Sequence, residues 1–69
     1  MRNLIKERLK ELRKESGLTQ KQIAKIINKS ETGYASWEQG LAEPGINDLI
    51  ALSEFYNVSI DYMVGKEDI

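Results

Sequence analysis

The sequence predicts an all-α fold, a compact bundle of five helices. Apolar residues recur at intervals of three and four along most of the chain, and no alternating strand pattern is visible. Pro44 is the only proline, and glycine or asparagine follows each helical segment. A chain of 69 residues is near the lower size limit for an unassisted core. We therefore expect residues 1–69 to form one domain.

The first helix is expected over about residues 4–15. Ile5, Leu9 and Leu12 share one face of it, and Gly17 follows its end. Its glutamates and lysines alternate at i,i+4 spacing, which is typical of a solvated face. The same cations would also suit nucleic acid, and the pattern alone does not decide between the two.

Residues 19–39 predict two short helices joined by a tight turn. Thr19 caps the first helix, and a glutamine three residues later completes a capping box. Asn28 suits the left-handed backbone at that helix's end. Ser30 caps the second helix, which Gly40 closes. Many small proteins use such a helix pair to enter the major groove of DNA.

Two further helices are expected after the break at Pro44. The fourth covers about residues 46–57, and the short fifth covers residues 60–64, between Ser59 and Gly65. The periodicity selects a single small core, whose expected members are Ile5, Leu9, Leu12, Leu18, Ile23, Ala24, Ile27, Tyr34, Trp37, Leu49, Leu52, Val58, Ile60 and Met63.

Composition excludes several classes of protein. Histidine and cysteine are absent, which removes the usual zinc ligands, the usual general base and disulfides. We expect no enzyme, no catalytic residue, no cofactor and no metal. No apolar run approaches a membrane span of roughly 18 residues, so we expect a cytoplasmic protein without a membrane partner. Residues 1–30 carry a net charge of +6 and residues 31–69 a net charge of −7, and such a basic half would suit nucleic acid.

The chain resembles the phage repressor and Cro family of helix-turn-helix DNA-binding domains, often called the XRE family. The resemblance spans roughly residues 5–65 and implies a lambda-repressor-like fold. Residues 44–65 mirror the family's fourth and fifth helices. The other shared features are Arg13, Gln20, Ala24, Asn28, Tyr34 and Trp37-Glu38 before Gly40.

The resemblance also exposes departures from the family pattern. The second helix of the pair carries no lysine or arginine. Lys29 stands where the family usually buries an aliphatic residue, and Ile26 stands where it is usually polar. We expect Ile26 and Leu41 to be exposed apolar residues that could meet a partner.

Arg13 and Glu38 are expected to form a structural ion pair. Glu38 falls on the same side of its helix as the apolar Tyr34 and Trp37, so its carboxylate needs a partner. The resemblance pairs it with Arg13. A contact between Arg13 and DNA phosphate is the alternative.

The helix over residues 31–39 is expected to present a polar face to DNA. Opposite Tyr34, about 100° per residue places Thr32, Ser36 and Gln39 together, with Glu31 in the first turn. The resemblance supports Glu31, Thr32 and Ser36 as base readers. The alternative is that these small polar residues merely solvate an exposed face. The expected phosphate contacts are Gln20, Lys21, Lys29 and Ser30, of which the resemblance supplies Gln20 and Ser30.

The predicted function is sequence-specific DNA binding by a repressor-like transcriptional regulator, acting as a homodimer on a palindromic operator of double-stranded DNA. The expected dimer interface is Ile60, Tyr62, Met63 and Val64, whose side chains cannot all point inward on one short helix, and the resemblance places a common dimer contact there. The alternative is a protein-interaction module on the same scaffold, such as an antirepressor or switch partner, with weak or no DNA binding.

Overall fold

The computed structural model describes residues 4–66, and in that range the chain folds into five α-helices with no strand. The predicted all-α class is confirmed, and the first helix begins one residue later than expected. The helices are α1 (Ile5–Glu15), α2 (Gln20–Ile26), α3 (Glu31–Gln39), α4 (Ile46–Tyr56) and α5 (Ile60–Val64).

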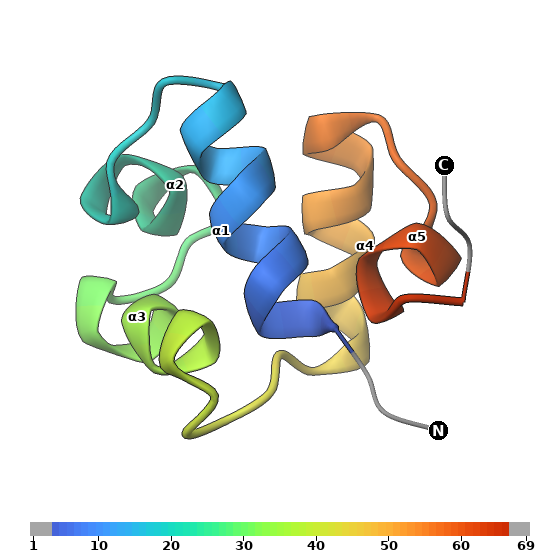
Figure 1. Cartoon of the computed structure of the whole chain (residues 1–69). Helices are drawn as coiled ribbons and strands as arrows, with labels where there is room; N and C mark the ends of the chain where they lie inside the picture. The colour runs from blue at the N-terminus through green and yellow to red at the C-terminus, as the bar shows by residue number, and fades with distance from the viewer. Residues whose placement is uncertain (1–3, 67–69) are drawn as a thin grey trace.

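Helix α1 lies between two pairs of helices. Figure 1 shows α2 and α3 on one side of it and α4 and α5 on the other. Helix α1 packs against α3 and α5, α2 packs against α3, and α4 packs against α5. The first helix therefore joins the predicted helix pair to the C-terminal half of the described chain.

The predicted caps define the ends of α2 and α3. The Thr19 hydroxyl accepts the Gln22 amide at 3.1 Å, and the Gln22 side-chain oxygen accepts the Thr19 amide at 2.8 Å. Ser30 Oγ accepts the Gly33 amide at 3.0 Å at the start of α3. Asn28 has φ +63°, as expected for the turn. Local hydrogen bonds thus fix where α2 and α3 begin.

The core is a single cluster to which each of the five helices contributes buried residues. Its ten buried apolar residues all belong to the predicted core; Leu18, Ile27, Val58 and Ile60 are partly buried against it. Tyr56, Tyr62 and Val64 pack there too, which the sequence analysis did not predict. The buried set is Ile5, Leu9, Leu12, Ile23, Ala24, Tyr34, Trp37, Leu49, Leu52 and Met63.

Candidate nucleic-acid interface

A buried carboxylate holds α3 to α1. Glu38 is 6% exposed. Arg13 Nε donates to its Oε2 at 2.7 Å, and Arg13 Nη2 donates to its Oε1 at 3.1 Å. The structure thus joins the two residues that the sequence analysis paired. Since Arg13 Nη1 also donates to the Leu18 carbonyl at 3.1 Å, the guanidinium is committed inside the fold rather than to phosphate.

Two more side chains donate hydrogen bonds to the Glu38 carboxylate. The Tyr34 hydroxyl donates to Oε2 at 2.6 Å, and Gln20 Nε2 donates to Oε1 at 3.1 Å. Burial alone would raise the pKa of Glu38, but the hydrogen bonds from Arg13, Tyr34 and Gln20 outweigh it, so the pKa lies below its ordinary value. Burial and the bond to this carboxylate raise the pKa of Tyr34. One ionised group therefore connects α1, α2 and α3.

The polar face of α3 points away from this network. Tyr34 is fully buried, whereas Glu31, Thr32 and Gln39 are exposed. Ser36 is half-buried, and its hydroxyl donates to the Gly33 carbonyl at 2.6 Å. Because this bond uses the only hydroxyl proton, Ser36 presents acceptor lone pairs to its surroundings. Thr32, Ser36 and Gln39 thus lie opposite Tyr34, and Glu31 is exposed in the first turn of the same helix.

Gly33 protects the cap of α3. A Cβ added at this position would lie 2.9 Å from Ser30 Oγ, and no atom of α2 comes within 4 Å of it. The absence of a side chain at Gly33 is therefore not explained by close packing of α2. It leaves room for the Ser30 hydroxyl, which caps α3.

The candidate phosphate contacts differ in what already occupies them. Lys21 and Ser30 are exposed, and the Ser30 hydroxyl proton is still available because its oxygen acts as the cap acceptor. The Gln20 side chain is half-buried and bound to Glu38. Lys29 Nζ lies 3.2 Å from Oδ1 of Asp48 on α4. Neither the bond from Gln20 to Glu38 nor the pairing of Lys29 with Asp48 was predicted from the sequence.

A hollow lies beside the helix-turn-helix. It has a volume of about 310 Å³ and brings three lysines together next to the start of α3. Lys25 was not among the predicted site residues, although its i,i+4 spacing from Lys21 on α2 was a usable signal. The lining residues are Lys21, Ala24, Lys25, Asn28, Lys29 and Glu31.

Helix α5 presents only part of the predicted dimer interface. Met63 is fully buried in the core of its own chain, so it offers no surface to a second copy, and its place in the predicted interface is wrong. Ile60, Tyr62 and Val64 are partly buried and keep some exposed area. The Tyr62 ring also packs against the Arg8 guanidinium, whose Cζ lies 4.3 Å from the centre of the ring.

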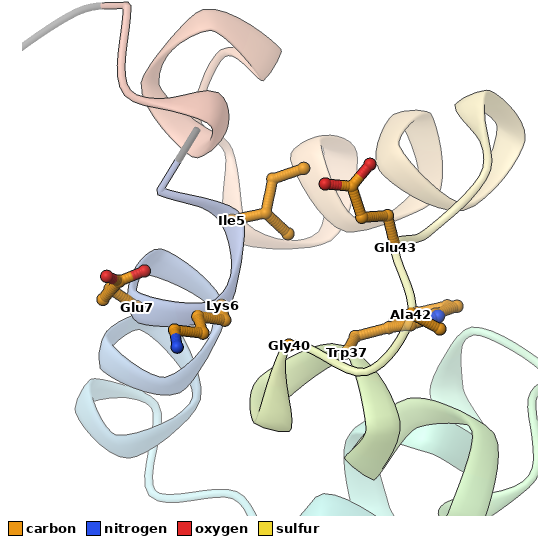
Figure 2. A pocket seen from close by; sticks show the side chains of 7 residues that line it. All are labelled: Ile5, Lys6, Glu7, Trp37, Gly40, Ala42 and Glu43. Atoms are coloured by element: carbon orange, nitrogen blue, oxygen red, sulfur yellow. The ribbon is translucent and has the colours of Figure 1, made fainter. Parts of the chain in front are cut away.

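A second hollow, of about 210 Å³, lies away from these candidates. Figure 2 shows it between the start of α1 and the loop after α3, with Ile5 and Glu43 facing each other across it. None of the predicted DNA-contacting residues lines it. Its walls are Ile5, Lys6, Glu7, Trp37, Gly40, Ala42 and Glu43.

Several apolar side chains remain exposed. Leu41 is 78% exposed and Ile26 is 48% exposed, as the sequence analysis expected, and α4 adds Ile46, Ile50 and Phe55.

Between residues 4 and 66 no helix is long and apolar enough to cross a bilayer. The same residues include no group of three acidic side chains that could hold a metal ion.

Comparison with known families agrees with this architecture. A Helix-turn-helix family model matches residues 9–63. The chain therefore belongs to the helix-turn-helix family of the phage repressor and Cro type, which confirms the resemblance. Members of this family are transcriptional regulators and not enzymes, as the composition had suggested.

Individual relatives are regulators of bacteria and phages. The chain is 38% identical over 63 residues to the HTH-type transcriptional regulator ImmR of Bacillus subtilis, covering 91% of this chain and 50% of ImmR. It is 37% identical over 62 residues to the cryptic phage CTXphi transcriptional repressor RstR of Vibrio cholerae, covering 90% of this chain and 55% of RstR. The chain thus spans about half the length of these relatives.

Solved structures match the fold closely. A transcriptional regulator from Listeria innocua superposes with a TM-score of 0.92 at 33% identity, covering 100% of this chain and 64% of that one. The P22 c2 repressor in complex with a synthetic operator superposes with a TM-score of 0.85 at 30% identity, covering 93% of this chain and 97% of that one. The predicted lambda-repressor-like fold is confirmed.

Proposed function

We propose that this chain is a sequence-specific DNA-binding domain of a cytoplasmic, repressor-like transcriptional regulator that binds a palindromic operator as a homodimer. Residues 1–69 would form the DNA-binding domain, with residues 19–39 as the helix-turn-helix. RstR is a transcriptional repressor and the P22 c2 repressor was solved with a synthetic operator, which supports a repressor-like role, whereas the relative BcrR of Enterococcus faecalis is a transcriptional activator.

The observation that carries this proposal is the outward polar face of α3. Thr32, Ser36 and Gln39 lie on the side of α3 opposite Tyr34, and Glu31 is exposed in the first turn, on a helix whose inner side is fixed by Tyr34 and the buried Glu38. A recognition helix needs this arrangement, because direct readout requires side chains placed rigidly along the floor of the groove. Glu31 can accept from the amino group of cytosine, and Gln39 can pair with adenine.

Phosphate contacts would fix the register on the duplex. Lys21 in the first turn of α2 and Ser30 before α3 carry exposed donors, and the backbone amides at the start of α2 favour an anion. Gln20 would reach phosphate only by releasing Glu38. A dimer through the exposed parts of Ile60, Tyr62 and Val64 would set two half-sites about 34 Å apart, one turn of DNA.

A gel shift with bulk genomic DNA at increasing salt tests DNA binding directly. Each neutralised phosphate contributes about 0.9 to the log–log salt slope. The three lysines beside the start of α3 therefore predict a slope for the dimer of roughly −4 if Asp48 holds Lys29, and of roughly −5 if Lys29 also binds phosphate. Absence of binding at about 50 mM salt contradicts the proposal.

The exposed apolar residues favour a second candidate, a protein-interaction module on the same scaffold. Leu41 is exposed in the loop after α3, and residues 41–43 of this loop include no lysine or arginine that could bind the DNA backbone. Such a module would give no salt-dependent shift of genomic DNA, so the same experiment separates the two functions.

A further inference from the structure

Lys29 is tied to a helix outside the helix-turn-helix. It lies in the turn between α2 and α3, and its ammonium is 3.2 Å from Oδ1 of Asp48 in the first turn of α4. The two side chains are 43% and 18% exposed, so the pair lies at the surface, where water and anions can reach the ammonium. Such a pair opens readily, because solvent screens its attraction.

Asp48 is fixed more firmly than its partner. Its other oxygen, Oδ2, accepts the backbone amide of Gly45 at 3.2 Å and so caps α4. The carboxylate therefore stays in place whether or not Lys29 is bound, whereas the flexible lysine stem allows the ammonium to move.

Lys29 is one of three lysines that line one hollow. Lys21 and Lys25 line the same hollow beside the start of α3, and in the part of the chain that the structure describes neither has an ion-pair partner. Three lysines against one carboxylate, Glu31, give this hollow a net positive charge that would attract a phosphate backbone. Asp48 removes one of these three charges from that field.

We propose that Asp48 is a positioning residue that lowers DNA affinity by holding Lys29 on α4. The inference rests on the proposed function. When the Lys29 ammonium binds a DNA phosphate instead, the Asp48 carboxylate loses its ion-pair partner and remains close to the negatively charged DNA. A lysine that is already neutralised also displaces fewer counterions from DNA. Lys29 in the wild type should therefore add little to affinity or to salt dependence.

The test is a double-mutant cycle measured by fluorescence anisotropy on a labelled random-sequence 30-base-pair duplex. The variants are Asp48→Asn, Lys29→Ala and the double variant; asparagine keeps a carbonyl that can accept the Gly45 amide. Glu54→Gln, an exposed change on the same helix, controls for the loss of one negative charge. Thermal unfolding of each variant shows that it is folded.

Asp48→Asn should tighten binding severalfold and steepen the salt slope of the dimer by about 1.8, which is 0.9 for each protomer. Lys29→Ala should cancel that gain in the Asp48→Asn background and change the wild type little. If Asp48→Asn leaves the slope unchanged, or steepens it no more than Glu54→Gln does, the inference is wrong while DNA binding stands. If neither wild type nor Asp48→Asn binds at about 50 mM salt, the proposed function fails, and this inference fails with it.

Discussion

Replacing Glu38 by alanine tests how α3 is held. The carboxylate side chain is 2% exposed and accepts bonds from Arg13, Tyr34 and Gln20. Truncation removes the acceptor and leaves the Arg13 guanidinium, whose side chain is 14% exposed, with its bond to the Leu18 carbonyl alone. It also strands the hydroxyl of the fully buried Tyr34.

The expected cost is about 3 kcal/mol for the uncompensated charge, at the lower end for a broken buried pair because Arg13 keeps some contact with water. The stranded Tyr34 hydroxyl adds on the order of 1 kcal/mol. A domain of this size has a total stability of roughly 3–10 kcal/mol. The variant should therefore be close to unfolding at room temperature, and measurements belong at low temperature.

Urea unfolding followed by far-ultraviolet circular dichroism measures the effect. With an m-value of about 1 kcal/mol/M, the combined loss of about 4 kcal/mol should lower the midpoint of Glu38→Ala by about 4 M. Arg13→Met combined with Glu38→Leu should recover much of the loss, since apolar replacement of a whole buried pair is often neutral. Glu54→Ala, on the exposed side of α4, is the matched control. A wild-type midpoint for Glu38→Ala would refute the reasoning.

Because the folded pKa of Glu38 is lowered, the stability it provides is present above its ordinary pKa of 4.5 and is lost as pH falls through the folded value. Glu38→Gln should therefore flatten the decline in unfolding free energy from about pH 5 to pH 3, and an equal slope in both proteins would contradict this. The wild type should sediment as a dimer at high micromolar concentration or on DNA; a monomer in both conditions rules out the α5 interface. Thr32→Ala or Ser36→Ala should relax base preference at one operator position by about 1 kcal/mol, whereas Lys21→Ala should weaken all sequences alike. A uniform loss from all three variants would argue against base reading by α3.

Local signals account for what the sequence predicted well. The helix ends depend on residues within four positions of each other, such as the reciprocal bonds of Thr19 and Gln22 or the left-handed Asn28. The core follows from helical periodicity, which is also local. These features can therefore be read from a short window of sequence.

Contacts between distant residues could be predicted only in part. Because a buried carboxylate needs a partner, the sequence predicted a cation beside Glu38. The family resemblance identified that cation as Arg13. Lys29 and Asp48 are both surface residues with many possible partners, and no spacing rule joins them. Their pairing depends on how α4 lies against the turn.

The error at Met63 has a similar origin. On a helix of five residues, periodicity cannot tell which apolar side chain faces the core and which faces a partner. The packing of α5 against α1 and α4 decides it, and that packing buries Met63 completely.

Selection of bound sequences from a random DNA pool tests the central claim most directly. If α3 reads bases in a dimer, the pool should converge on a palindrome whose half-sites lie about 10 base pairs apart, centre to centre. Recovery of bound DNA without any enriched sequence, or of no DNA at all, would contradict sequence-specific recognition by this chain.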